Sequence, residues 1–372
     1  MKKQIVKEFI TVKKVYRLPR EPSPPPPPPK RHVLAVGCCT LDMITIVDLP
    51  LTPGQKQRTK DGQWRRGGSA TNICTVWRRL GLDCEFLGVL SSVRAFESLL
   101  NGLLSQGIDI SHCPMTSHYP AHRSVIMRRD ADIRTILEFS NVHQEITYQQ
   151  FVGAVDYQKY SWIHFEGRNP AETQRMMMAV RDFNQRCPNL RIVTSADVDN
   201  LRPATMLMAS FVDYVFIRRA TKDAYSFMNG REVVCAARDA INDARSKWQK
   251  TQPRKMPYLL PDEPAEDSEE RCKATPPDKP VVIYSNYSEG ASCLMADDTF
   301  FKVGPQIPSR IVDSVAVNDT FSAATIYALE KVRMKLRDAL EYGARASALK
   351  MTENGFDILR CLPKDLMGCY YA

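Results

Sequence analysis

From residue 32 onward, short apolar runs alternate with longer segments of helical periodicity. Apolar runs of this length predict buried strands. A glycine directly after a segment of helical periodicity, such as Gly81, predicts the end of a helix. The expected strands are 33–37, 160–165, 212–217 and 281–285, and the expected helices are 69–80, 320–331 and 336–351. The alternation indicates βαβ units, so we expect an α/β fold with a central, mostly parallel sheet flanked by helices.

Two segments do not follow this pattern. Residues 1–31 are basic and run into six consecutive prolines, Pro24 to Pro29, which predicts a disordered basic, proline-rich tail. A mitochondrial presequence is the alternative, which the acid Glu8 and the scarcity of Ser and Arg disfavour. Residues from about 251 to 280 carry seven prolines and an acidic cluster at 266–270, which predicts a disordered insertion. Residues 32–372 therefore form one domain with an insertion.

Composition excludes several function classes. The 372 residues are 44% hydrophobic and 25% charged, which is ordinary for a globular protein that buries a full core. No run approaches the roughly 18 apolar residues that a membrane span needs. The net charge of +9 is spread along the chain without an RNA-binding signature or zinc-finger spacing, so we expect anionic nucleotides rather than nucleic acid as partners.

The cysteines and histidines point away from metal and covalent chemistry. The 11 cysteines are odd in number and include no Cys-x-x-Cys pair, which fits reduced thiols in a cytoplasmic protein. The six histidines have no zinc-ligand spacing, and His164 in an apolar run is expected to be a core residue. No Gly-x-Ser-x-Gly motif supports a hydrolase.

A glycine pair, Gly67-Gly68, precedes the helix expected at 69–80. Such a pair lets backbone approach a ligand, and the helix N-terminus offers free N–H groups to a hydroxyl or an anion. A tight turn is the alternative interpretation of the pair alone. Further segments follow it in order: 134–137, 162–169 (Trp-Ile-His-Phe-Glu-Gly-Arg-Asn), 313–323 (Asp-Ser-Val-Ala-Val-Asn-Asp-Thr-Phe-Ser-Ala) and 354–357.

Together with 36–42, these segments resemble the ketohexokinase (fructokinase) branch of the ribokinase-like, phosphofructokinase-B type carbohydrate kinases, over roughly residues 32–360. The resemblance implies a ribokinase-like fold with a small β-sheet lid, a homodimer formed through the lids, and transfer of the ATP γ-phosphoryl group to fructose. It implies Asp319 as the general base, Mg²⁺ between the phosphates and a K⁺ site beside Asp313. The sugar-binding residues implied are Asp42, Gly68, Ser69, Asn72, Glu166 and Asp319. The ATP-binding residues implied are Arg134, Tyr287, Ser288, Glu289, Gly290, Ala316, Val317 and Asn318.

The chain departs from the family pattern at several of these positions. Ala316 and Asn318 replace the glycines of the family's Gly-Ala-Gly turn, and we expect their Cβ atoms to crowd the phosphate. Ser69 replaces an asparagine, and serves either the sugar or the helix as an N-cap. Arg218 and Arg219 follow an expected strand where relatives carry polar or acidic groups, and would bind phosphate unless they form a surface pair. A turn glycine at 290 is also required by any tight hairpin there.

These departures leave three hypotheses open. The first is an active fructose kinase, the second is a catalytically impaired pseudokinase that retains sugar or nucleotide binding, and the third is a kinase for another sugar.

Overall fold

The computed structural model describes residues 31–50, 52–59, 61–128, 134–139, 144–251 and 279–364. The predictions of a disordered tail at 1–31 and of a disordered insertion at about 251–280 fall almost entirely outside the described residues. The compact unit that follows Lys30 carries all the elements discussed below.

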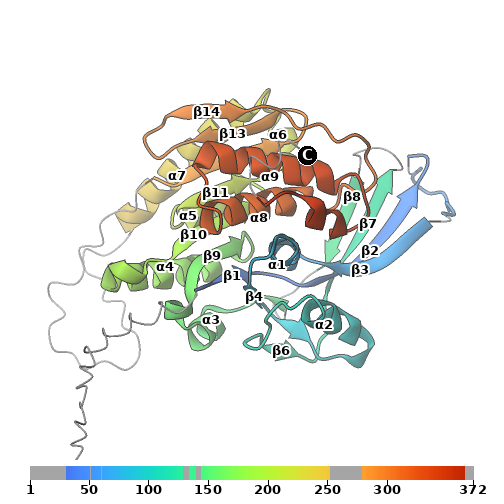
Figure 1. Cartoon of the computed structure of the whole chain (residues 1–372), viewed down its shortest axis with the longest axis horizontal. Helices are drawn as coiled ribbons and strands as arrows, with labels where there is room; N and C mark the ends of the chain where they lie inside the picture. Colours follow the sequence, from blue (N-terminus) through green and yellow to red (C-terminus); the bar gives the residue numbers. More distant parts are fainter. Residues whose placement is uncertain are drawn as a thin grey trace, which may run out of the picture. The chain divides into compact units, whose positions relative to one another are not determined.

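An eight-stranded sheet forms the centre of this unit, in the order β14-β13-β12-β11-β10-β9-β1-β4 (Figure 1). The six strands from β12 to β4 are parallel, and β13 and β14 are antiparallel to their neighbours. The strands are β1 (His32–Val36), β4 (Cys84–Leu87), β9 (Tyr160–Glu166), β10 (Val193–Val198), β11 (Tyr214–Ile217), β12 (Val281–Asn286), β13 (Gly290–Leu294) and β14 (Phe300–Val303). This arrangement confirms the predicted α/β fold.

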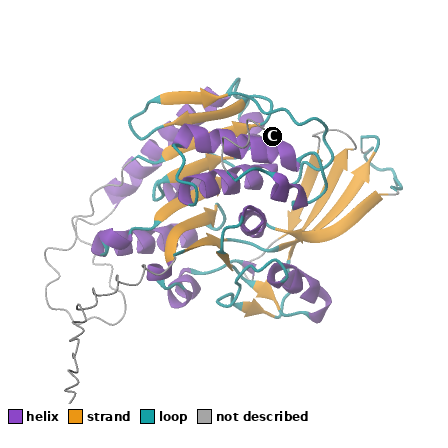
Figure 2. Ribbon diagram, in the orientation of Figure 1, coloured by secondary structure: helices purple, strands orange, loops and turns teal. Residues whose placement is uncertain are grey.

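Helices cover both faces of the sheet, because its strands are apolar on both sides. Val33 and Ala35 of β1 pack with α1, α8 and α9, whereas Leu34 and Val36 pack with α4, α5 and α7 on the opposite face (Figure 2). The α-helices are α1 (Ser69–Leu80), α2 (Glu97–Leu104), α3 (Tyr148–Ala154), α4 (Pro170–Arg186), α5 (Pro203–Ala209), α6 (Arg219–Ala224), α7 (Gly230–Thr251), α8 (Val317–Glu330) and α9 (Leu336–Lys350). Short 3-10 helices are η1 (Arg94–Phe96), η3 (Tyr157–Lys159), η4 (Pro188–Leu190) and η5 (Asp357–Cys361).

A separate four-stranded sheet, called the small sheet below, projects from the edge where β1 ends (Figure 1). Its order is β3-β2-β7-β8, with β2 parallel to β7 and the other pairs antiparallel. The strands are β2 (Thr40–Val47), β3 (Asp61–Gly67), β7 (Ala121–Arg128) and β8 (Arg134–Phe139); β5 (Leu90–Ser91) and β6 (Met115–Thr116) pair elsewhere. One face buries Ile44, Val125 and Met127 against Val315, which lies just before α8.

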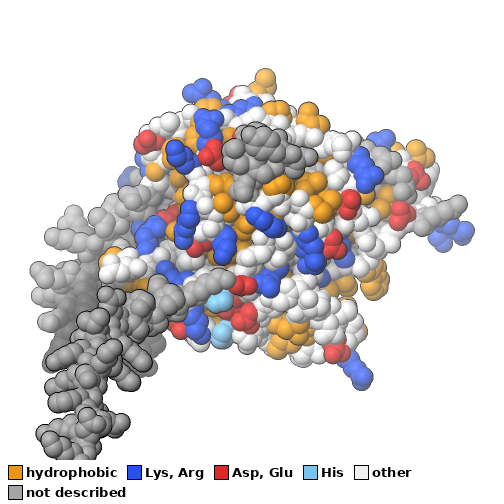
Figure 3. All heavy atoms as spheres, in the orientation of Figure 1, with side chains coloured by type: hydrophobic (Ala, Val, Ile, Leu, Met, Phe, Trp, Pro, Cys, Tyr) orange, Lys and Arg blue, Asp and Glu red, His pale blue; other side chains and the backbone are white. Residues whose placement is uncertain are grey.

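The predicted elements all exist, and only their ends shift. The helix at 69–80 is confirmed residue for residue. Helix α8 begins at Val317 rather than 320, because Ala316 adopts a left-handed conformation with φ of 64° and serves as its N-cap. No described helix is long and apolar enough to cross the membrane. On the face drawn in Figure 3, Lys and Arg side chains are interspersed with acidic and apolar ones.

Candidate active site

Asp319 lies in the first turn of α8, at the edge where the parallel strands of the main sheet end. Its carboxylate is buried and accepts two hydrogen bonds, one on each oxygen. Asn72 Nδ2 of α1 donates to Oδ2 at 2.8 Å, and Arg218 Nη2 donates to Oδ1 at 3.0 Å. Residues far apart in the sequence therefore meet at this carboxylate, as the parallel sheet topology requires.

Arg218 directly follows β11, and its guanidinium contacts residues of α8, α1 and β10. The same Nη2 atom also donates to Ser69 Oγ at 2.6 Å and lies 3.5 Å from Asp197 Oδ2. Burial lowers the pKa of Arg218, but the Asp319 and Asp197 carboxylates outweigh burial and hold this pKa above its ordinary value. Ser69 is the first residue of α1 and Gly68 is the N-cap, so Ser69 does not serve as the N-cap.

Asp197, at the end of β10, is a buried carboxylate that the sequence interpretation did not single out. Ser322 Oγ of α8 donates to its Oδ1 at 2.8 Å, and His164 Nε2 lies 3.8 Å from its Oδ2. Burial raises the pKa of Asp197, but the opposite effect of His164 and Arg218 is larger, so the pKa lies below its ordinary value. His164 is fully buried, as predicted. The signal for Asp197 in the sequence was weak, because half of the residues of β10 (Val193–Val198) are polar and no strand was predicted there.

The sugar-side residues lie where β1, β2 and α1 meet. Asp42 of β2 is buried and accepts a hydrogen bond from Thr40 Oγ1 at 2.7 Å, and burial raises its pKa. Gly68 has a φ of 100°, and a Cβ atom there would lie 2.0 Å from the Cys38 carbonyl oxygen. This glycine is therefore required for α1 to begin against the β1–β2 corner.

Glu166, another predicted sugar ligand, sits behind α1. Its Oε2 accepts hydrogen bonds from the backbone N–H groups of Cys38 at 2.9 Å and Ala70 at 3.4 Å. Its Oε1 faces Arg123 at 3.7 Å and Arg168 at 3.9 Å. One oxygen of Glu166 is thus used to hold the start of α1, which leaves Oε1 as the atom available to a ligand.

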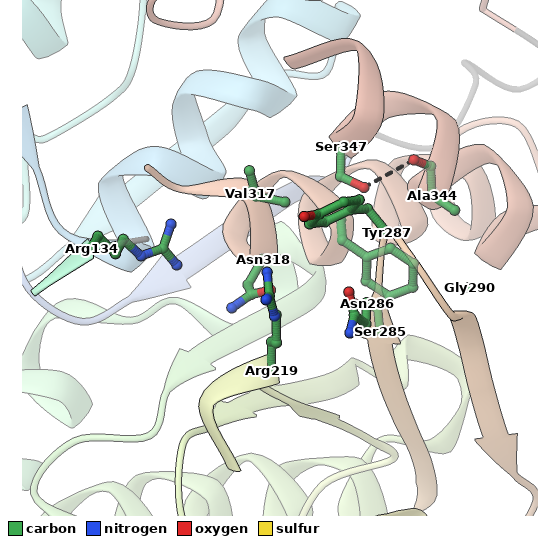
Figure 4. Close-up of a pocket in the computed structure, with 11 residues that line it drawn as sticks. Arg134, Arg219, Ser285, Asn286, Tyr287, Gly290, Val317, Asn318, Ala344 and Ser347 are labelled. Carbon is green, nitrogen blue, oxygen red and sulfur yellow. Dashed lines mark hydrogen bonds between the residues drawn. The ribbon is translucent and has the colours of Figure 1, made fainter. Parts of the chain in front are cut away.

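A cleft between the end of β12, α8 and α9 contains five of the predicted ATP residues and adds Arg219 (Figure 4). Arg134 enters from the start of β8, on the side opposite Tyr287 and Asn286. The Arg219 guanidinium lies 5.4 Å from the centre of the Tyr287 ring. The cleft is lined by Arg134, Arg219, Ser285, Asn286, Tyr287, Gly290, Val317, Asn318, Phe321, Ala344 and Ser347. Arg218 and Arg219 are thus not a surface pair, because Arg218 contacts Asp319 whereas Arg219 lines the cleft.

Two of the other predicted ATP residues, Ser288 and Glu289, support this cleft rather than line it. Ser288 Oγ donates to Asn286 Oδ1 at 3.0 Å, and Glu289 forms an ion pair with Lys222 of α6. A Cβ atom on Gly290, which has a φ of 86°, would lie 2.0 Å from the Val303 carbonyl oxygen. Strand pairing therefore requires this glycine, whatever it offers a nucleotide.

The turn before α8 forms with Ala316 and Asn318 where the family pattern has glycines. Ala316 adopts the left-handed conformation that a glycine would adopt more cheaply, by roughly 1 kcal/mol. Ala316 packs against the apolar cluster of the small sheet and does not line the cleft described above, whereas Asn318 does. The first N–H groups of α8 lack intrahelical acceptors and remain donors for an anion.

Comparison with known proteins agrees with this fold. Residues 30–364 match the family model described as pfkB family carbohydrate kinase. The chain is 26% identical to mouse (Mus musculus) ketohexokinase over 330 residues, which cover 88% of this chain and 98% of that protein. Among solved structures, ribokinase from Giardia lamblia is similar with a TM-score of 0.68 at 12% identity, covering 92% of this chain and 99% of that one. Ribokinase from Cryptococcus neoformans in complex with ADP has a TM-score of 0.65 at 12% identity, with the same coverage.

Proposed function

The chain belongs to the pfkB family of carbohydrate kinases, which are ATP-dependent phosphotransferases, and we propose that it phosphorylates fructose on its 1-hydroxyl with Asp319 as the general base. The observation that carries the proposal is the buried Asp319 carboxylate in the first turn of α8, between the sugar-side residues and the nucleotide cleft. A carboxylate has about four acceptor positions, so the bonds from Asn72 and Arg218 leave room for a sugar hydroxyl.

In this mechanism the side chains of Asp42, Ser69 and Asn72 bind the sugar hydroxyls. Asp319 orients the acceptor hydroxyl towards the γ-phosphoryl group and takes its proton late in the transition state. The N–H groups that open α8 and the Arg218 guanidinium stabilise the negative charge on the transferring group.

ATP would bring Mg²⁺ to this site as the counter-ion of its phosphates. Among the described residues, no group of three or more His, Cys, Asp or Glu side chains is arranged to hold a metal ion. Asp197 and Asp319 both face Arg218. The phosphates would therefore supply most of the ligands of Mg²⁺, and no step of the mechanism is assigned to the ion.

A second candidate function is that of a pseudokinase. The ion pair between the Arg218 guanidinium and Asp319, the proposed base, favours it. The test for both is ADP formation with ATP and Mg²⁺, with and without fructose. Fructose-dependent ADP supports the kinase. If none forms, ribose, other ketoses and nucleosides are tested as acceptors, and a large gain in the double variant Ala316→Gly/Asn318→Gly identifies an impaired kinase.

Replacing Arg219 by Gln is expected to weaken ADP binding about 10- to 100-fold, because a hydrogen bond to a charged group contributes roughly 1.5–3 kcal/mol. Isothermal titration calorimetry with ADP measures the change. Arg231→Gln is the matched control, since that guanidinium also lies over a ring, Phe300, at 5.0 Å but outside the cleft. If the two variants bind ADP with equal affinity, Arg219 does not contribute to nucleotide binding.

We also propose that the small sheet forms a homodimer through its outer face. Trp64, Met43, Ser124 and Leu137 form one row across the four strands, on the side away from Asp42. Trp64 and Leu137 are 73% and 64% exposed, although both are large and apolar. An exposed apolar row of this kind is typical of a protein interface.

The double variant Trp64→Asp/Leu137→Asp is therefore expected to be a monomer, since it places two charges in the proposed interface. Light scattering after size-exclusion chromatography measures the mass of the variant and of the unchanged protein. Ile307→Asp, at a position that is 75% exposed but outside the small sheet, is the control and is expected to stay dimeric. A monomeric unchanged protein contradicts the proposal.

A further inference from the structure

Asp313 lies at the start of the turn that precedes α8, and both oxygens of its carboxylate accept hydrogen bonds from other residues of the protein. Arg65 donates to Oδ2 at 2.8 Å and to Oδ1 at 3.3 Å. The backbone N–H groups of Val315 and Gly355 donate to Oδ1 at 2.9 Å and Oδ2 at 3.1 Å. Asp313 is only 2% exposed, so these contacts replace its hydration.

A second cation, the ammonium of Lys350, completes this arrangement. Its Nζ lies 2.7 Å from Asp313 Oδ2 and donates to the Asp313 carbonyl oxygen at 2.9 Å. It also lies 5.6 Å from the centre of the Phe356 ring. The side chain is fully buried, which a charged lysine tolerates only with such partners.

Lys350 is the last residue of α9, so its charge also lies at the negative end of that helix dipole. The backbone N–H groups of Val312 and Asp313 donate to the Met351 carbonyl oxygen at 2.8 and 3.2 Å. The end of α9 and the start of the α8 turn are thus joined both by backbone bonds and by the buried ammonium. Ser314, the next residue of the turn, accepts a hydrogen bond from Arg134 through its carbonyl oxygen.

A monovalent cation beside Asp313, which the family resemblance implies, does not fit these residues. A hard cation needs carboxylate and carbonyl oxygens as ligands. Both carboxylate oxygens and the carbonyl oxygen of Asp313 already accept hydrogen bonds from N–H groups. Two positive groups, Lys350 and Arg65, contact a single carboxylate, and they would repel a third cation.

We infer that the Lys350 ammonium is a built-in cation that takes the place of an exchangeable monovalent ion beneath the anion-binding turn, and that this protein needs no K⁺ there. In support, the pKa of Asp313 lies well below its usual range, because Lys350 and Arg65 outweigh the effect of burial. Burial lowers the pKa of Lys350 to about 8, which still leaves the amine mostly protonated at neutral pH. The inference does not depend on phosphoryl transfer, and it holds equally for an active kinase and for a pseudokinase.

The first test compares the melting temperature of the full chain in KCl, NaCl and tetramethylammonium chloride at equal ionic strength. The unchanged protein is expected to melt at the same temperature in all three salts, with and without ADP. A rise that is specific to K⁺ overturns the inference, because it reveals a cation site that Lys350 has not filled.

The second test removes the ammonium. Lys350→Ala is expected to lower the melting temperature by on the order of 5–10 °C in tetramethylammonium chloride, because it leaves a buried carboxylate with one partner fewer. KCl is expected to restore part of this loss, since the cavity left by the side chain exposes the Asp313 oxygens to the ion. Lys247→Ala removes an exposed lysine from an ion pair with Asp243 and serves as the control.

A folded Lys350→Ala protein that does not respond to K⁺ overturns the claim that Lys350 stands in a cation site. If this variant does not fold, Lys350→Gln keeps a hydrogen-bond donor and most of the side-chain volume, and its response to KCl is judged in the same way. The salt comparison on the unchanged protein remains decisive in either case.

Discussion

Replacing Asp319 by Asn is expected to lower sugar-dependent ADP formation by about 10²–10⁴-fold, which is the usual contribution of a general base. The amide has nearly the same shape as the carboxylate and can still accept a hydrogen bond from Arg218, but it cannot take the proton of the acceptor hydroxyl. Coupled measurement of ADP release under saturating ATP gives the change in kcat.

The control for this variant is Asp338→Asn, which changes an acid in the first turn of α9 instead. It is expected to keep full activity. A melting-temperature rise with fructose in Asp319→Asn separates lost chemistry from lost binding, since a ligand that still binds still stabilises. An unchanged rate in Asp319→Asn would show that another group takes the proton.

Replacing Gly68 by Ala is expected to destabilise the protein by more than about 3 kcal/mol. The backbone conformation there, with φ of 100° and ψ of 133°, costs a residue with a side chain about 1–3 kcal/mol. The added Cβ atom would also lie 2.0 Å from the Cys38 carbonyl oxygen, so α1 or the β1–β2 corner must move. Because Ser69 and Asn72 follow on α1, weaker sugar binding is expected as well. Urea unfolding measures the loss of stability.

Gly81→Ala separates the two causes. Gly81 ends α1 with a φ of 87°, but a Cβ atom there meets nothing within 4 Å, so only the backbone strain remains. A cost of about 1–2 kcal/mol is expected. If Gly68→Ala costs no more than Gly81→Ala, the close approach at Cys38 is not important for stability.

The sequence determined the fold class and some of the elements of the main unit, because these depend on local signals. Short apolar runs predicted β1, β9, β11 and β12, helical periodicity predicted α1, α8 and α9, and Gly81 marked the end of α1. The family motifs predicted Asp319 as the base, Asn72 as a sugar-binding residue, and Tyr287 and Asn318 as ATP-binding residues, and these roles stay predictions. Element ends were less certain, since α8 begins three residues early on a left-handed alanine that local propensity disfavours.

Only the tertiary structure decided how the charged residues pair. In the sequence, Arg218 is either a phosphate-binding cation or part of a surface pair, and nothing local distinguishes Lys350 from a surface lysine. In the fold, Arg218 contacts Asp319 across 101 positions of sequence, and Lys350 contacts Asp313 across 37. Such pairs form because a charge that packing buries is stable only when an opposite charge lies beside it. Which opposite charge lies there depends on the neighbours in three dimensions and not on the spacing in the sequence.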